Sequence, residues 1–138
     1  MSRAAVTTSL GGMDRETARR LAASVAWGRI GLGVTAVLTP SVPLRPWVGR
    51  EIAWRPRAKL LARALGARDI ALGVGVILAL RHEAPVRGWV EGGGLADAGD
   101  VIATLLAFST LPKLGRWAVL GSAASAVAAS RLAAPAVD

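Results

Sequence analysis

The sequence predicts an all-α protein, a four-helix transmembrane bundle with a short interfacial segment between the first two helices. Hydrophobic residues make up 53% of the 138 residues, and the mean hydropathy is +0.46, both high for a soluble domain. Seven prolines leave four long runs of sequence uninterrupted, and proline disfavours the interior of a helix. Residues 70–80 and 101–108 are apolar on nearly every side, whereas a soluble four-helix bundle needs a broad polar face on each helix.

The proline-free runs set the bounds of the four predicted helices. Asp14 is the expected N-cap of the first helix, because aspartate readily accepts hydrogen bonds from the first free amides of a helix. In chain order the predicted helices cover residues 14–39, 57–81, 86–111 and 112–134. At a rise of about 1.5 Å per residue, each can cross a hydrocarbon core of about 30 Å.

The predicted helices form a single membrane domain over residues 14–134, between a flexible N-terminus, 1–13, and a C-terminal tail, 135–138. The first apolar run begins only after Arg19 and Arg20 and contains Arg29, which favours an uncleaved first span over a signal peptide. In the connection 41–56, Trp47 and Trp54 alternate with arginines. Tryptophan beside basic residues is typical of a membrane interface, so we expect a short interfacial helix there, with an ordinary polar loop as the alternative.

Charge and composition exclude several classes of function. The chain has no cysteine, so disulfide and thiolate chemistry are excluded, and the single histidine, His82, cannot form a histidine-rich metal site. The net charge of +8 is compatible with nucleic acid or with an anionic membrane surface. Because the basic residues lie mainly between apolar runs, we expect a multi-pass protein of the cell membrane, in contact with the lipid bilayer and not with nucleic acid.

Six charged side chains remain within the predicted spans. They are Arg29, Arg63, Arg68, Asp69, Asp97 and Asp100. Isolated charges are costly in a bilayer, so we expect these six to face the bundle interior and to pair. Asp97 and Asp100 are three residues apart and share one helix face, and glycines occur beside the charges on all three helices, where they allow close helix packing.

Four interpretations of this cluster stay open. It can fix the register between helices as an ion-pair network. It can border a pocket in which Asp97 or Asp100 is the catalytic acid or base and Arg29, Arg63, Arg68 and Asp69 are the candidate binding residues. It can also lie on a proton path, or Asp97 and Asp100 can hold a divalent ion. The last interpretation lacks the further acidic residues of such sites, so we expect neither a metal nor a cofactor.

Two segments carry a family resemblance. The stretches RALGARDIALGVG (63–75) and WVEGGGLADAGDVIA (89–103) resemble a family of small four-helix membrane proteins of actinobacteria, over a region from about Asp14 to Ala134. That family has no established activity. The resemblance therefore implies the four-helix membrane fold and assigns no catalytic residues.

The leading functional hypothesis is a small accessory or scaffold protein of the membrane with an interior arginine and aspartate network. Such a protein would associate with itself or with a partner membrane protein. A second hypothesis is a membrane-embedded enzyme or binding protein for an apolar small molecule, with an intramembrane aspartate as acid or base. A third is an oligomeric proton-coupled transporter. Whether the chain is an enzyme is left open by its sequence.

Overall fold

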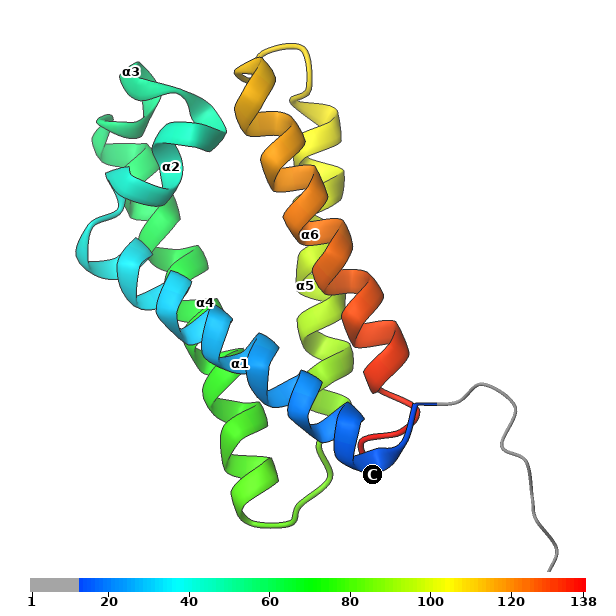
Figure 1. Ribbon diagram of the computed structural model, residues 1–138. Coiled ribbons are helices and arrows are strands. Elements are labelled where there is room, and N and C mark those ends of the chain that lie inside the picture. The colour runs from blue at the N-terminus through cyan, green and yellow to red at the C-terminus, as the bar shows by residue number, and fades with distance from the viewer. Residues whose placement is uncertain (1–12) are drawn as a thin grey trace, which may run out of the picture.

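The computed structural model describes residues 13–138, and within that range the protein is all-α, with six helices and no strand. The helices are α1 (Arg15–Leu38), α2 (Ser41–Val48), α3 (Arg50–Ala53), α4 (Pro56–Arg81), α5 (Arg87–Leu106) and α6 (Lys113–Ala133) (Figure 1). The four long helices, α1, α4, α5 and α6, correspond to the four predicted helices. The connection 41–56 contains two short helices. Except for Met13, the expected flexible segment 1–13 lies outside the described residues.

Local chemistry explains where the first two long helices begin. The Asp14 carboxylate caps α1 by accepting hydrogen bonds from the Thr17 backbone amide at 2.9 Å and from the Thr17 hydroxyl at 2.7 Å. Pro56 occupies the first turn of α4, where its missing amide proton costs no intrahelical hydrogen bond.

Helix α5 ends five residues earlier than expected, at Leu106 instead of Leu111. The residue before a proline avoids the helical conformation, and Pro112 therefore disfavours continuation of the helix up to its neighbour. The resulting turn is held by Arg116, whose guanidinium donates to the Phe108 carbonyl at 2.8 Å. The shorter helix removes apolar length from the third predicted span.

Helices α1 and α4 pack closely because glycines line their contact. A Cβ atom added to Gly66 would lie 2.7 Å from the Gly33 carbonyl oxygen and 2.8 Å from the Ala36 Cβ. A Cβ added to Gly73 would lie 2.6 Å from the Ala26 carbonyl oxygen. Only glycine permits this backbone approach, so α1 and α4 form one tightly packed pair.

The second pair is formed by α5 and α6, and the two pairs contact each other mainly at their ends (Figure 1). At one end a core cluster that includes Ala18, Val76, Val90 and Ala133 joins α1, α4, α5 and α6. At the other end α2 packs against α6, where Gly115 contacts the Pro46 backbone. Between these contacts the ribbons of the two pairs diverge.

Residues 135–138, expected to be a tail, are packed against the domain. Val137 is fully buried in the core cluster. The Asp138 carboxylate accepts hydrogen bonds from the amides of Val86 at 2.7 Å and Arg87 at 3.2 Å. The N-cap of α5 is Val86, which has no capping side chain of its own. Asp138 therefore caps a helix that begins 51 residues before it in the sequence.

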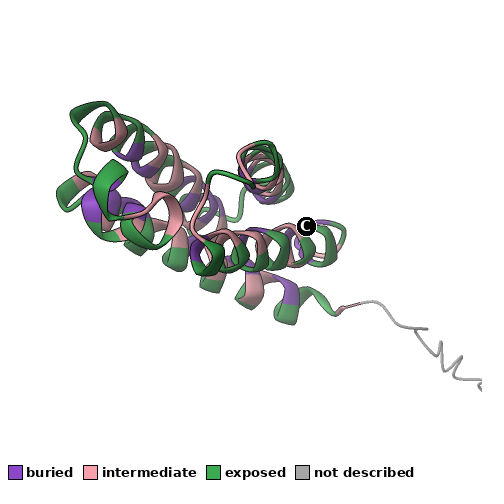
Figure 2. Ribbon diagram, turned by 90° about the horizontal axis from the view of Figure 1, so that it is seen from above, coloured by how far each residue is buried: buried purple, intermediate pink, exposed green. Residues whose placement is uncertain are grey.

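Small residues fill the interior and large apolar residues lie outside. Ten of the fifteen buried hydrophobic residues are alanine, which explains how the helices approach so closely. In Figure 2 the outward sides of the helices are largely exposed. The exposed large hydrophobic residues include Trp27, Leu38, Leu60, Leu78, Ile102, Leu106, Leu114 and Trp117. This distribution is the reverse of that in a soluble domain, where large apolar side chains form the core.

The length and hydropathy expected of a membrane span are met, among the described helices, by α1 alone. A single such helix near the start of a chain is also what a signal sequence or the core helix of a soluble protein presents. The coarse prediction of an all-α protein is thus confirmed, and the four-span arrangement stays a prediction. Charged residues in α4, the shortened α5 and the alanine and serine content of α6 account for the difference.

Candidate functional site

Five of the six predicted site residues lie together in one charged network. Helix α1 contributes Arg29, α4 contributes Arg68 and Asp69, and α5 contributes Asp97 and Asp100. The network therefore connects the α1–α4 pair with the α5–α6 pair. It lies between the two ends at which the pairs are packed.

Arg29 is the centre of the deeper half of the network. Its guanidinium pairs with Asp69 Oδ1 through Nη1 at 3.2 Å and with Asp97 through Nη2. Nη2 also donates to the Gly93 carbonyl oxygen at 2.9 Å. Asp97 is only 7% exposed, so this pair is held in a desolvated environment, where one charge without the other is strongly unfavourable.

Arg68 forms the shallower half. It binds Asp100 through two parallel hydrogen bonds, Nη1 to Oδ1 at 3.2 Å and Nη2 to Oδ2 at 2.9 Å. This fork geometry suits the planar guanidinium and is among the stronger ion-pair arrangements. Arg68 also donates from Nη2 to Asp69 Oδ1 at 3.1 Å. Asp69 Oδ1 thus accepts hydrogen bonds from both arginines and joins the two halves of the network.

Arg63 departs from the expectation that it faces the interior. Its side chain is exposed, and its Nε donates to the Val37 carbonyl oxygen at 3.2 Å. Arg63 and Arg68 are five positions apart on α4, which places them about 140° apart around the helix axis. Relative to Asp69 the two arginines are about equally far around the helix axis, at about 100° for Arg68 and about 120° for Arg63, so a helical projection does not tell which of them joins the network.

Two glycines of α5, Gly93 and Gly94, also belong to the site. Gly92, Gly93 and Gly94 lie within a continuous helix, and no break occurs beside Asp97. A Cβ on Gly93 would lie 3.2 Å from Arg29 Nη2, and one on Gly94 would lie 2.9 Å from the Ser130 Cβ. Gly93 therefore makes room for the Arg29 guanidinium, and Gly94 allows α6 to approach.

A cavity of about 300 Å³ lies beside the network, between the two helix pairs. Arg68, Asp69 and Asp100 form its charged side. The other walls are mostly apolar and come from α1, α2, α4 and α6; they include Leu32, Ala36, Leu44, Trp47, Leu65 and Val119. This volume is at the lower end of the range of small-molecule sites. On the deeper side, beside Arg29, only a void of about 20 Å³ is present, enough for about one water molecule.

Chemically, the site offers carboxylates that are already engaged. Asp97 and Asp100, the candidate catalytic residues, each pair with an arginine, so proton transfer by either one would require that pair to open. No group of three or more histidine, cysteine, aspartate or glutamate side chains suited to a metal ion occurs in the described part of the chain. The arrangement is suited to holding the helix pairs in register and to presenting one charged wall to the cavity.

Comparisons with protein-family models, with curated proteins and with solved structures gave no match. The resemblance to an actinobacterial membrane-protein family therefore stays a prediction.

Proposed function

We propose that this chain is a multi-pass membrane protein that binds an apolar small molecule in the cavity between its two helix pairs. The observation that carries this proposal is the cavity itself, which combines mostly apolar walls with a charged network on one side. A few fixed polar groups in an otherwise apolar pocket are typical of small-molecule sites.

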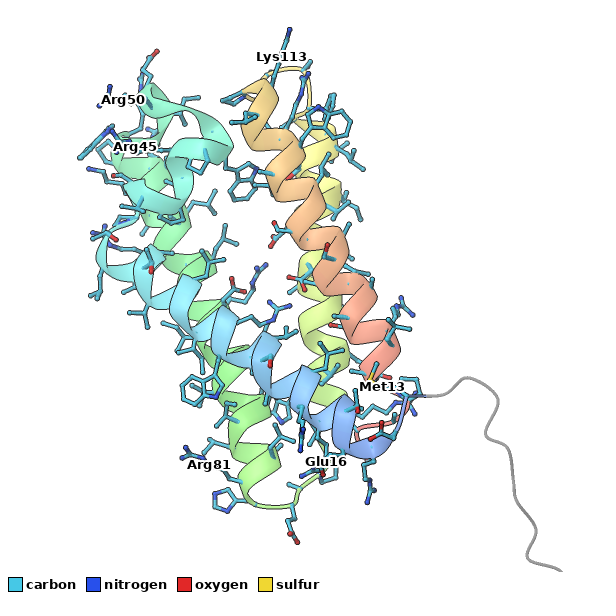
Figure 3. The ribbon with its side chains drawn as sticks, viewed as in Figure 1. Met13, Glu16, Arg45, Arg50, Arg81 and Lys113 are labelled. Atoms are coloured by element: carbon cyan, nitrogen blue, oxygen red, sulfur yellow. The ribbon has the colours of Figure 1, made fainter. Side chains whose placement is uncertain are left out.

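The membrane part of the proposal is supported by the inverted distribution of side chains. Alanine and glycine pack between the helices, and leucine and tryptophan lie outside, as expected where lipid tails cover the outer surface. In Figure 3, Arg45, Arg50 and Lys113 lie at one end of the molecule and Glu16 and Arg81 at the other. Charged residues at both ends are expected where helices emerge into the headgroup regions.

Binding is favoured over catalysis because both candidate catalytic carboxylates, Asp97 and Asp100, are already paired with an arginine. Acid–base chemistry needs a carboxyl group able to exchange a proton with the substrate, whereas Arg29 and Arg68 hold Asp97 and Asp100. The same network fixes α5 relative to α1 and α4, and thereby the width of the cavity.

A second candidate is the accessory or scaffold role, for which one surface feature argues independently. On α6 the exposed residues Gly121, Ser125 and Ala128 follow one another at intervals of four and three. An exposed face of small residues allows two helices to associate closely in a membrane. Self-association through α6 is compatible with ligand binding, because the cavity opens between the helix pairs.

The membrane proposal is tested by cell fractionation. The protein should stay in the membrane fraction after a sodium carbonate wash at high pH, which releases peripheral proteins. Recovery in the wash would refute membrane insertion.

The binding proposal is tested by native mass spectrometry of protein purified in mild detergent. Ala123 is buried and lines the cavity, so Ala123→Leu reduces the cavity volume, and Ser122→Leu is a second such variant. The wild type should retain a small-molecule adduct that both variants lose. Gly121→Leu, on the neighbouring exposed position, is the control and should keep the adduct. An adduct of equal abundance in all four proteins would refute binding in this cavity.

A further inference from the structure

We infer that the molecule bound in the cavity is a protonated amine carried on an apolar body. This inference rests on the proposed function and concerns the chemistry of the ligand. Three features of the site lead to it: the balance of charge in the network, the hydrogen-bonding atoms that remain free, and the size and lining of the cavity.

The network has a surplus of negative charge. It contains two guanidinium groups, Arg29 and Arg68, and three carboxylates, Asp69, Asp97 and Asp100, so its formal charge is −1. The nearest further arginine on α4, Arg63, is directed to the Val37 carbonyl. A buried charge without a partner is unfavourable, and a cationic ligand would supply the missing positive charge.

The free hydrogen-bonding capacity also favours a donor. All three hydrogen bonds to Asp69 are accepted by Oδ1, which leaves Oδ2 without a bond to any described residue. Among residues 13–138, Arg116 Nε is the one side-chain nitrogen or oxygen that is both fully enclosed and without a hydrogen bond. Asp69 Oδ2 also has no hydrogen bond, so it is not fully enclosed and is accessible. Asp69 lines the cavity.

The same geometry disfavours an anionic ligand. Arg68 is the arginine that lines the cavity, and its guanidinium already donates to both Asp100 oxygens and to Asp69. An anion would have to displace one of these carboxylates. An ammonium group can instead add to the network, because a carboxylate oxygen accepts more than one hydrogen bond.

The rest of the ligand should be apolar and of moderate length. The walls opposite the network include Leu32, Leu44, Trp47 and Val119. A volume of about 300 Å³ corresponds to about ten water-sized groups at about 30 Å³ each. An alkyl chain of about that many carbons, ending in an ammonium group, would fill the cavity.

Trp47 makes the inference testable, because bromine quenches tryptophan fluorescence on contact. The full chain is placed in phosphatidylcholine nanodiscs at neutral pH and titrated separately with bromodecylamine, bromodecanol and bromodecanoate. Quenching of Trp47 is obtained by subtracting the signal of the Trp47→Phe variant, which corrects for probes dissolved in the bilayer. The amine should bind about tenfold more tightly than the alcohol, because charge-assisted hydrogen bonds are much stronger than neutral ones. The carboxylate should bind most weakly.

The outcomes separate this inference from the proposed function. Equal or tighter binding of bromodecanol or bromodecanoate would overturn the amine inference and leave the cavity as a binding site. Absence of Trp47 quenching by all three probes would overturn both. If phosphatidylethanolamine in the nanodisc displaces bromodecylamine, the natural amine is a lipid headgroup; if it does not, the natural ligand is a free amine, and both results support the inference.

A charge variant gives the second test. Asp69→Asn keeps the side-chain volume and removes the surplus charge, so the preference for the amine over the alcohol should fall to about twofold or less while the alcohol binds as before. Glu91→Gln removes one negative charge from an exposed pair with Arg87, outside the network, and should keep the full preference. An unchanged preference in Asp69→Asn would overturn the inference. If Asp69→Asn does not fold, the comparison of the three probes on the wild type decides.

Discussion

Replacement of Gly66 by alanine should destabilise the contact between α1 and α4. The added Cβ would lie 2.7 Å from the Gly33 carbonyl oxygen and 2.8 Å from the Ala36 Cβ, well inside ordinary van der Waals separation. One of these neighbours is backbone, so the clash cannot be relieved by a side-chain rotation and the helices must move apart. Asp69, three residues along the same face of α4, would move with Gly66 and loosen its pairing with Arg29.

The magnitude follows from two opposing effects. Alanine is favoured over glycine within a helix by about 1 kcal/mol, and overpacking a closely packed interior costs about 1–3 kcal/mol. Because the contact involves two close neighbours, we expect the overpacking cost to prevail, with a net loss of about 1–2 kcal/mol. Gly31→Ala is the matched control: a Cβ at Gly31 meets nothing within 4 Å, so this variant should gain up to about 1 kcal/mol.

Both variants are measured by denaturant unfolding of the purified protein in the same detergent, monitored by the loss of helical circular dichroism. Gly31→Ala should therefore be the more stable variant by about 1–3 kcal/mol, the sum of its expected gain and the loss in Gly66→Ala. If Gly66→Ala is as stable as Gly31→Ala, α1 and α4 do not approach as closely as the structure indicates.

Three further predictions concern the network and the helix ends. Asp97→Asn should lower the free energy of unfolding by about 1.5 kcal/mol, because Arg29 loses a buried charge-assisted hydrogen bond while Asp69 remains its counter-ion; an effect below about 0.5 kcal/mol in the same detergent unfolding assay would contradict this. Asp138→Ala should lower the free energy of unfolding by about 1 kcal/mol and speed amide exchange in the first turn of α5. Unchanged exchange there would count against Asp138 as the cap of α5. The hydrogen bonds from Thr17 lower the pKa of Asp14 below its ordinary value of 3.8, so its stabilisation of α1 is complete above that value and is lost as the pH falls through the lowered pKa. Asp14→Asn should therefore speed Thr17 amide exchange near neutral pH and much less in acid. If the ratio of the Thr17 exchange rate in the variant to that in the wild type is the same at both pH values, the charge of Asp14 does not stabilise the start of α1.

Part of the site was predictable because its residues are unusual where they occur. Charges within apolar runs are expensive, so the expectation that Arg29, Arg68 and Asp97 face one another follows from solvation alone. Glycines spaced along the same faces indicated where helices approach. The sequence pattern could not tell which arginine binds which aspartate, because that depends on the rotation and displacement of each helix against the others.

Other features depend on residues that are far apart in the chain. The Asp138 carboxylate caps α5, and Val137 enters a core formed mainly by α1, α4 and α5, although residues 135–138 were expected to be a C-terminal tail. No local periodicity identifies such a contact. The turn that follows α5 is likewise held by a residue of another helix, because Arg116 of α6 donates a hydrogen bond to the Phe108 carbonyl.

The sequence by itself determined that the protein is helical, where the long helices lie to within five residues, and that Arg29, Arg68 and the three aspartates had to find partners. These properties follow from proline geometry, hydrophobic patterning and the cost of desolvating a charge, all of which act locally. The tertiary structure alone decided the pairing in the network, the exclusion of Arg63 from it and the cavity between the helix pairs. The cavity exists because the pairs are packed together at both ends and diverge between them, beside the network, and that shape is a property of helix packing that no single segment encodes.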